Sequence, residues 1–420
     1  MYAKLFLNAR EEKEIQQGFP WVFDNEISHL KYRADVSDPT SEWKNESLGE
    51  ASVADGSAVE VFTKAGGFLG TGIFNKKSKI TVRLIGTEHA EKIFENTALF
   101  WEKRIESAYN YRQLYYSPYD SYRLVFGEAD FVPGFICERF CTEDGKIYLV
   151  VQFLAMACEV FRDDILKALK KVCKPDGIFE KSDESVREKE GLPLVNGWIF
   201  GKQAATDIVI LENEVRLCVD IKGGQKTGYF LDQKFNREQI KRFCHGKKVL
   251  DTFTHTGAFG LNAFKAGARD VTSVDISQEA VDMVNRNIKL NGAEKVMKAV
   301  CSDVFDLLKK YEADGERFDV IILDPPAFTK SAKNIQKAYG GYKEINLRAM
   351  RLLNEGGILV TCSCSHFFDS ATFYDMIMHA AMDSHKRVQI LEKRSAGPDH
   401  PVLAGYPKSE YLKVAFCTVR

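Results

Sequence analysis

The chain has 420 residues, a formal net charge of -1, 45% hydrophobic residues and 28% charged residues. This length predicts two or three domains, and the composition excludes a disordered or fibrous protein. Neither a signal-peptide core nor an 18-residue apolar run is found, so we expect a cytoplasmic protein without membrane contact. The small net charge gives no global basic field, and it permits a homodimer.

Ten cysteines are spread along the chain, and none forms a C-x-x-C pair. A chain of this length does not need a disulfide framework, so these residues are expected to be reduced and mostly buried thiols. No metal site is predicted.

Residues 1–86 are predicted to form a small β-rich module with a short helix at 9–17. Residues 31–49 are polar and predict a loop, and strand-like runs divided by turn residues follow at 59–62, 68–74 and 80–85. Basic residues without acidic neighbours occur between positions 62 and 83, and again between 325 and 343. Such runs are usually solvated surface, but they make local phosphate binding plausible.

A second module is predicted at residues 95–221, after a helical stretch at 98–114. It mixes strands with one helix at 160–172, which has apolar residues at helical spacing. The strands are expected at 122–126, 134–139, 147–153, 177–181, 198–200, 208–212 and 215–221. This pattern indicates an α+β domain without a chemical motif.

From residue 222 the pattern becomes a regular alternation of strands and helices. In the stretch 249–275, a strand ends at Asp251, Gly257 supplies a turn, a helix follows, and a second strand ends at Asp275. An acidic residue at the second strand end can accept both hydrogen bonds of a ribose diol. The carboxylate of Asp251 would repel the pyrophosphate of a dinucleotide. It would attract the amino-acid part of S-adenosylmethionine, which carries an ammonium and a sulfonium group. S-adenosylmethionine is therefore favoured over a dinucleotide.

Two more acidic residues follow strand-like runs, Asp303 after 296–300 and Asp324 after 318–323. A helix is predicted at 342–353 and is expected to stop at Gly356-Gly357, before a strand at 358–362. Because parallel strands present their carboxyl ends at one edge of a sheet, the acidic residues should line a single ligand site. The prediction is a doubly wound α/β domain over residues 222–420.

Asp324-Pro325-Pro326 resembles the catalytic loop of methyltransferases that act on planar bases. Two prolines hold the backbone rigid, so that carbonyl groups and a carboxylate can meet an in-plane amine or ring nitrogen. Related loops serve amino nitrogens, ring nitrogens and ring carbons, and the motif alone leaves these substrates open.

The presence of Cys364 favours a ring carbon of a pyrimidine as the atom that accepts the methyl group. Carbon 5 of a pyrimidine is a weak nucleophile until a thiolate adds to carbon 6, and such a thiolate must stand at the ligand edge of the sheet. Cys364 follows a predicted strand in a polar Ser-Cys-Ser turn, whereas Cys362 lies in the strand. We therefore predict that Cys364 is the nucleophile and that Cys362 is a small buried hydrophobic residue.

Over essentially its whole length the chain resembles the bacterial large-subunit (23S) ribosomal RNA cytosine-5 methyltransferases of the RlmI type. The segments that carry this resemblance are FPWVF (19–23), RLVFGEADFVPGFICERF (123–140), FEKSDESVREKEGL (179–192), IKGGQKTGYFLDQKFNR (221–237), ILDPPAFTK (322–330), GGYKEINLRAMRLLNEGGILVTCSCS (340–365) and DHPVLAGYPKSEYLK (399–413).

The resemblance implies an N-terminal PUA-like RNA-binding β-barrel, a middle α+β domain and a C-terminal Rossmann-like class I methyltransferase domain. It implies Cys364 and Asp324 as catalytic residues, S-adenosylmethionine as cofactor and large-subunit ribosomal RNA as partner. The predicted cofactor-binding residues are Asp251, Phe253, Gly257, Asp275, Ile276, Asp303 and Asp324. The chain departs from other cytosine-5 enzymes in lacking a second cysteine in the Asp-Pro-Pro loop, so the base that removes the carbon-5 proton stays unidentified.

Two rival functions remain open at this stage. A sister group that methylates guanine on a ring nitrogen shares the Asp-Pro-Pro-x-Phe loop, but it lacks a cysteine in the later turn. A non-enzymatic RNA-binding assembly factor that retains the fold is the second rival. Uracil in place of cytosine is a variant of the main hypothesis, because thiolate addition serves both bases.

Overall fold

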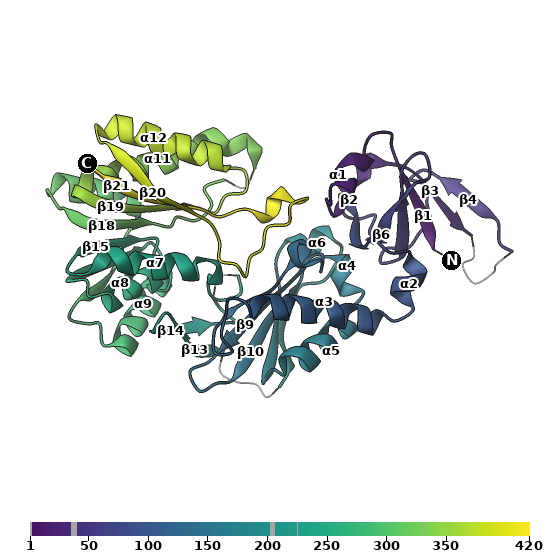
Figure 1. The fold of residues 1–420 in the computed structure, drawn as a ribbon, viewed down its shortest axis with the longest axis horizontal. Coiled ribbons are helices and arrows are strands. Elements are labelled where there is room, and N and C mark those ends of the chain that lie inside the picture. Colours follow the sequence, from purple (N-terminus) through teal and green to yellow (C-terminus); the bar gives the residue numbers. More distant parts are fainter. Residues whose placement is uncertain (1, 35–39, 202–205, 225, 330) are drawn as a thin grey trace. The chain divides into compact units, whose positions relative to one another are not determined.

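The computed structural model describes residues 2–34, 40–201, 206–224, 226–329 and 331–420. The chain folds into two compact units (Figure 1), and each unit is built from separate segments. The first unit comprises Met1–Thr206, Ile221–Gly228 and Pro398–Ser409, and the second comprises Asp207–Asp220, Tyr229–Gly397 and Glu410–Arg420. Within the described ranges, no helix combines the length and apolarity needed to cross a membrane.

The first unit begins with a seven-stranded sheet in the order β2-β7-β6-β5-β1-β3-β4. Its strands are β1 (Ala3–Leu7), β2 (Trp21–Phe23), β3 (Ile27–Arg33), β4 (Trp43–Glu46), β5 (Ala58–Phe62), β6 (Phe68–Phe74) and β7 (Ile80–Gly86). Alternate residues such as Leu5, Leu7, Val59 and Val61 are fully buried and form the core of this sheet. The predicted helix is present but shorter, as α1 (Glu12–Gln16).

The predicted loop at 31–49 is wrong in part. Strand β3 continues to Arg33, and β4 pairs with it in an antiparallel arrangement in which Trp43 lies opposite Arg33. The sequence did not predict β4, because this edge strand is exposed and lacks the alternation of apolar and polar residues that a half-buried strand shows. Residues 35–39 lie outside the described part of the chain.

The basic run between 62 and 83 is not a continuous solvated face. Arg83 is buried and forms ion pairs with Glu128 at 2.8 Å and Glu190 at 3.3 Å. Its guanidinium therefore stabilises the first unit and is not available to bind a phosphate. In the second run Lys333 and Lys337 are exposed, and Lys330 lies outside the described residues.

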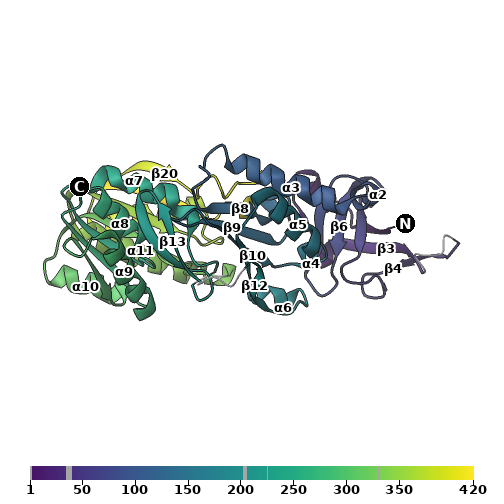
Figure 2. The same ribbon diagram turned by 90° about the horizontal axis from the view of Figure 1, so that it is seen from below.

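The rest of the first unit is a five-stranded sheet in the order β12-β11-β10-β9-β8. Its strands are β8 (Tyr122–Phe126), β9 (Phe135–Cys141), β10 (Ile147–Phe153), β11 (Gly177–Ser182) and β12 (Val195–Phe200). Two long helices, α3 (Thr97–Arg112) and α5 (Arg162–Cys173), pack against each other beside it (Figure 2). The short helices of this unit are α2 (Ala90–Phe94), α4 (Met156–Glu159) and α6 (Val186–Lys189). The expected α+β character is therefore present.

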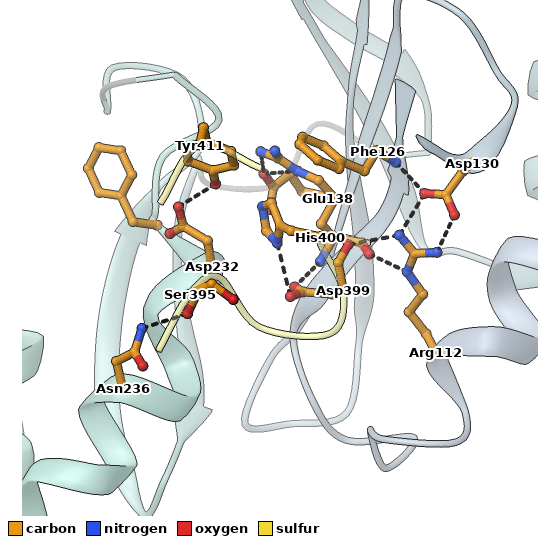
Figure 3. Close-up of polar contacts among 12 residues, drawn as sticks. Arg112, Phe126, Asp130, Glu138, Asp232, Asn236, Ser395, Asp399, His400 and Tyr411 are labelled. Carbon is orange, nitrogen blue, oxygen red and sulfur yellow. Dashed lines mark hydrogen bonds and ion pairs between the residues drawn. The ribbon is translucent and has the colours of Figure 1, made fainter. Parts of the chain in front are cut away.

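Arg112, at the end of α3, joins distant parts of the first unit (Figure 3). Its side chain is fully buried and pairs in bidentate fashion with Asp130, at 2.5 and 2.6 Å. The guanidinium also donates to the backbone carbonyls of Arg123, at 2.9 Å, and Asp399, at 2.8 Å. The Asp399 carboxylate in turn accepts from the Arg123 amide at 2.9 Å. Arg112 thus holds the segment Pro398–Ser409 in the first unit.

Replacing Arg112 by alanine is expected to destabilise the first unit by about 3–5 kcal/mol, because removal of one buried partner leaves Asp130 uncompensated. All four tryptophans lie in the first unit, so tryptophan fluorescence during denaturant unfolding reports on it selectively. Lys171→Ala, which breaks the exposed pair with Glu102, is the control and should cost less than about 1 kcal/mol. An equal loss of unfolding free energy in both variants would contradict this role of Arg112.

The second unit contains a seven-stranded sheet in the order β17-β16-β15-β18-β19-β21-β20, in which β15–β19 run parallel and β21 is antiparallel to both neighbours. Its strands are β15 (Lys248–Thr252), β16 (Asp270–Asp275), β17 (Met297–Cys301), β18 (Phe318–Leu323), β19 (Leu353–Ser363), β20 (Val388–Arg394) and β21 (Lys413–Val419). The chain reverses its direction of winding between β15 and β18, and ligands bind at such switch points in open sheets.

Helices cover both faces of this sheet (Figure 1). On one face lie α7 (Lys234–Cys244), α8 (Ala258–Lys265) and α9 (Gln278–Asn291), and on the other lie α10 (Val304–Ala313), α11 (Ile335–Leu352) and α12 (Ser370–Ser384). Tyr342, Ile345 and Met376 are fully buried in the core beneath the second set. The doubly wound α/β prediction is confirmed.

The helix predicted at 342–353 starts earlier, at Ile335, and ends within one residue of its predicted end, but Gly356-Gly357 do not stop it as predicted. Helix α11 ends at Leu352 and strand β19 begins at once, with both glycines inside the strand. The pairing with β18 shifts between Leu353 and Ile358, and Gly356 has a φ of 73°. The glycines therefore form an irregularity in a strand, which a sequence pattern cannot distinguish from a helix stop.

The predicted boundary at residue 221 differs from the division into units. Hairpin β13 (Asp207–Glu212) and β14 (Val215–Asp220) belongs to the second unit, because it packs on α9. The Cys218 amide donates to Asn287 at 2.8 Å, and the Arg216 amide donates to Asn291 at 3.0 Å.

Candidate active site

The predicted acidic residues of the second unit meet at one edge of the parallel sheet. Asp251 is the penultimate residue of β15, Asp275 ends β16, and Asp303 follows β17 as the N-terminal cap of α10. Asp324 follows β18 directly, and Cys364 follows β19 directly. Since these strands are neighbours and parallel, the five residues share the carboxyl edge on which ligands bind.

The turn after β15 is built around Asp251, which is fully buried. Its Oδ2 accepts hydrogen bonds from the Gly260 amide and the Ser273 hydroxyl, both at 3.0 Å, and from the Thr254 hydroxyl. Gly257 has a φ of 82°, a left-handed conformation that favours glycine. A Cβ on Gly260 would lie 2.4 Å from the Ser273 hydroxyl oxygen, so only glycine lets α8 approach the strands this closely.

The other carboxylate oxygen of Asp251 fits a cationic ligand. Oδ1 is buried and has no hydrogen-bond partner among the described residues. Burial raises the pKa of Asp251 to about 6, although hydrogen bonds from Thr254, Ser273 and Gly260 oppose this. Native proteins rarely leave a buried acceptor unpaired without a functional reason. The ammonium group of S-adenosylmethionine has the charge and the donors to satisfy Oδ1.

Asp275 and Ile276 suit the nucleoside part of the same cofactor. The Asp275 carboxylate accepts from the His255 amide and from the Ser277 amide, both at 3.0 Å, which fixes its orientation at the strand end. Ser277 is the N-cap of α9 and accepts a hydrogen bond from the Ala280 amide. Ile276 is 67% exposed and offers apolar surface at the end of β16.

Asp303 and Phe253 complete the predicted cofactor set. Asp303 accepts from the Phe305 amide at 2.7 Å through Oδ1, as an N-cap of α10. Phe253 has a φ of 56°, and its ring centroid lies 6.4 Å from that of Phe328 in the Asp-Pro-Pro loop. A non-glycine residue in this backbone region is strained, and such strain concentrates at ligand-binding turns.

The Asp324 carboxyl has a pKa well above the ordinary value for aspartate. Burial, together with the nearby charge of Asp232, raises its pKa to about 7, while Arg237 and a hydrogen bond from Gln233 act in the opposite direction. Gln233 Nε2 donates to Asp324 Oδ1 at 3.0 Å. A carboxyl that titrates near neutral pH can either donate or accept a proton at a base edge.

The two cysteines of the Ser-Cys-Ser region differ as predicted in their placement. Cys362 is fully buried inside β19, and burial raises the pKa of its thiol well above the ordinary value. Cys364 is half-buried beyond the strand end, and its Sγ lies 3.9 Å from the Pro325 carbonyl oxygen. Cys364 therefore adjoins the Asp-Pro-Pro loop, whereas Cys362 is enclosed within the sheet near Gln233 and Asp324.

Lys413 fixes the turn that carries Cys364. It lies opposite Ser363 in the pairing of β21 with β19, and its Nζ donates to the carbonyls of Ser365, at 2.6 Å, and Tyr411, at 2.7 Å. Burial lowers the pKa of Lys413 to about 8, against the opposing effect of Cys364 and two acidic side chains. A positive charge near a thiol favours the thiolate.

The sequence interpretation missed Asp232, Gln233 and Lys413. All three lie in segments that carry the family resemblance, but their contacts join positions far apart in the chain. Gln233 reaches Asp324 across 91 residues, and Lys413 reaches Ser365 across 48. Their position in those segments was the one available signal.

Replacing Asp275 by alanine is expected to weaken binding of S-adenosylmethionine about 10- to 100-fold, the usual loss for one or two hydrogen bonds to a charged group. Isothermal titration calorimetry with S-adenosylmethionine and S-adenosylhomocysteine measures this directly. Asp282→Asn, on the exposed side of α9, is the control and should bind as the wild type does. Unchanged affinity in Asp275→Ala would remove this residue from the cofactor site.

Comparisons with known proteins agree with this geometry. A family described as S-adenosylmethionine-dependent methyltransferase matches residues 193–408, and a PUA-like domain family matches residues 5–87. A protein of Klebsiella pneumoniae (strain 342) named Ribosomal RNA large subunit methyltransferase I is 36% identical over 423 residues, covering 100% of this chain and 99% of that protein. A Salmonella enteritidis PT4 protein of the same name is 37% identical and is covered to 98%.

Solved structures show the same fold. A putative S-adenosylmethionine-dependent methyltransferase from Streptococcus mutans matches with a TM-score of 0.78 and 23% identity, over 100% of both chains. A second putative methyltransferase, solved with S-adenosylhomocysteine, matches with a TM-score of 0.77 and 22% identity over 100% of both chains. The chain therefore belongs to the S-adenosylmethionine-dependent methyltransferases, in the ribosomal RNA large subunit methyltransferase I family with a PUA-like N-terminal domain, and its methyl donor is S-adenosylmethionine.

Proposed function

We propose that this protein methylates carbon 5 of a cytosine in large-subunit ribosomal RNA, in the cytoplasm, with Cys364 as the covalent nucleophile. The observation that carries this proposal is the place of Cys364, directly after β19 and 3.9 Å from the Pro325 carbonyl of the Asp-Pro-Pro loop. The names of its full-length relatives support the class of RNA.

The residues of the site provide a route to carbon 5. The Cys364 thiolate adds to carbon 6 of the ring, which gives carbon 5 the character of an enamine and makes it nucleophilic. The Lys413 ammonium favours the thiolate, and Asp324 holds or protonates the polar edge of the base. Bound S-adenosylmethionine supplies an electrophilic methyl group on its sulfonium.

The proposed cofactor contacts divide among the strand ends. Asp251 with Gly257 receives the methionine part, Asp275 the ribose diol and Asp303 the adenine amine. Phe253 and Ile276 provide apolar surface beside the nucleoside. The unpaired Oδ1 of Asp251 and the exposure of Ile276 support this division.

The proposed RNA-binding part is the barrel of residues 1–86, followed by a middle domain at 95–221 and the methyltransferase domain at 222–420, with which the hairpin β13–β14 packs. The match of residues 5–87 to PUA-like domains supports the first assignment. A homodimer remains part of the proposal, and sedimentation of the purified protein tests it.

The test is methyl transfer from labelled S-adenosylmethionine to protein-free large-subunit rRNA that lacks the modification, followed by nucleoside analysis. Labelled 5-methylcytidine supports the proposal, and labelled 5-methyluridine would change only the base. Labelled guanosine would establish the ring-nitrogen or amino alternative. Absence of any labelled nucleoside would leave the RNA-binding assembly factor as the better hypothesis.

A further inference from the structure

One buried carboxylate beside the nucleophile turn has no role in the scheme above. Asp232 lies in the 3-10 turn Leu231–Gln233 before α7 and is only 8% exposed. Its Oδ2 accepts a hydrogen bond from the Tyr411 hydroxyl at 2.5 Å (Figure 3). Its Oδ1 is buried and has no hydrogen-bond partner among the residues that the structure describes. An unpaired buried acceptor costs free energy, so a ligand atom is expected to face it.

Asp232 is joined to the Asp-Pro-Pro loop. Its chain neighbour Gln233 donates to Asp324 at 3.0 Å. The charge of Asp232 is itself among the causes of the raised pKa of Asp324, so the two carboxyl groups are close. The backbone carbonyl of Asp232 accepts from the Gly397 amide at 2.8 Å, which fixes the turn.

Asp232 is also joined to the turn of Cys364. Its partner Tyr411 offers a backbone carbonyl to Lys413, and Lys413 binds Ser365, the residue after the nucleophile. The ring of His366 lies 5.5 Å from that of Tyr411. Asp232 is therefore connected to both elements that must contact a pyrimidine during the reaction.

The cytosine-5 reaction needs a base that the sequence does not reveal. The Asp-Pro-Pro loop holds no second cysteine, since Ala327 and Phe328 follow the prolines. Asp324 already binds Gln233 and is assigned to the base edge, and the carboxylate of Asp251 belongs to the cofactor turn. We propose that Asp232 is the catalytic base that removes the proton from carbon 5, an inference that rests on the Cys364 mechanism.

The step balances without another reactant. After methylation, carbon 5 carries the new methyl group and its original hydrogen, and carbon 6 carries the Cys364 sulfur. Asp232 Oδ1 takes the carbon-5 proton, and the electron pair of the broken C–H bond forms the double bond between carbons 5 and 6. The C–S bond breaks, and its electron pair returns to sulfur as thiolate. The protonated Asp232 then releases its proton to water.

The variant Asp232→Asn keeps the size of the side chain but cannot take the proton. With labelled S-adenosylmethionine and unmodified large-subunit rRNA, it should still transfer the methyl group and then stall before the thiolate leaves. After ribonuclease digestion, label should remain on the denatured protein at a level at least about tenfold above wild type. Release of free methylated nucleoside should fall about 10²- to 10⁴-fold.

Three controls separate the possible causes. Asp314→Asn, an exposed exchange at the end of α10, should behave as wild type. Calorimetry should show wild-type affinity of Asp232→Asn for S-adenosylmethionine; a large loss would place Asp232 in the cofactor site and overturn the proposal. Wild-type release of product, or methyl transfer lost with no protein-bound label, would also overturn it.

A substrate analogue separates this proposal from the mechanism beneath it. In rRNA transcribed with 5-fluorocytidine, fluorine cannot leave as a cation, so wild type and Asp232→Asn should both retain label on the protein. If wild type retains none on this RNA, the Cys364 mechanism has failed. If wild type retains label but Asp232→Asn on normal RNA does not, Asp232 alone has been misassigned.

Discussion

Replacing Cys364 by alanine is expected to lower the rate of methyl transfer by about 10⁴-fold or more, while leaving S-adenosylmethionine bound. Without the sulfur, no bond forms to carbon 6 and carbon 5 stays a weak nucleophile, so the loss should match that of other covalent nucleophiles. The side chain lies outside the sheet and is half-buried, so its truncation should change the stability of the second unit little. Initial rates with labelled cofactor and unmodified rRNA measure the effect.

A second cysteine provides the matched control for this experiment. Cys173 is a buried residue of α5 in the first unit, and Cys173→Ala should retain wild-type activity. If Cys364→Ala keeps its activity and the label appears in guanosine, Cys364 is a packing residue and the sister-group hypothesis is correct.

Replacing Asp324 by asparagine is expected to remove most of the activity and yet stabilise the second unit by about 1–4 kcal/mol at pH 8. Asparagine preserves the shape of the side chain but cannot exchange a proton with the base, for which a loss of about 10²- to 10⁴-fold is usual. The gain in stability follows from the raised pKa of Asp324, about 7, since this carboxyl must ionise in a poorly solvated place.

The pH dependence of this gain follows from the direction of the shift. Because the folded state binds the proton more tightly than the unfolded chain, the contribution of Asp324 to stability is complete below about pH 4. It is lost as the pH rises from about 4 to 7, and the penalty is constant above that. The stabilisation of Asp324→Asn should therefore be full at pH 8 and largely absent at pH 4. Denaturant unfolding followed by circular dichroism, at both pH values, measures it.

Asp319 offers a control of opposite sign on the same strand. Burial would raise the pKa of Asp319, but hydrogen bonds from the Lys248 amide and from Asn354 lower it overall. Asp319→Asn should therefore destabilise the protein at pH 8. An Asp324→Asn variant no more stable than wild type at that pH would show that the carboxyl is better solvated than its burial indicates.

The parallel core of the second unit could be predicted because each of its signals is local. A β-branched strand, a glycine turn and a capping serine such as Ser277 are readable within a few residues. The edge strands β4 and β20 were not predicted, and neither was β21, which is an interior strand with a nearly continuous buried run. Exposed edge strands have no buried face and therefore no alternation, and Gly356-Gly357 shows that one glycine pair can serve either a strand irregularity or a helix end.

The residues of the candidate site also fall into those that the sequence predicts and those that it does not. Acidic strand ends and the position of Cys364 follow from order along the chain, because topology brings strand ends together whatever the side-chain packing. The residues that contact these side chains cannot be predicted from order along the chain. Asp232 is one of four residues in Phe-Leu-Asp-Gln, and its burial and its contact with Tyr411, 179 residues later, exist only in the folded unit.

The division of the chain into interleaved segments also constrains how the protein can be synthesised. Arg112 binds the backbone carbonyl of Asp399, and the Arg123 amide binds its carboxylate, yet Asp399 follows Arg112 by 287 residues and Arg123 by 276 residues. Until Asp399 has left the ribosome, the Arg112 guanidinium has Asp130 and the Arg123 carbonyl as partners, but it and the Arg123 amide each lack the partner that Asp399 provides. Neither unit can be obtained by cutting the chain at a single peptide bond, and a fragment ending at residue 206 would lack the segment Pro398–Ser409. The two units should therefore mature together rather than in the order of translation.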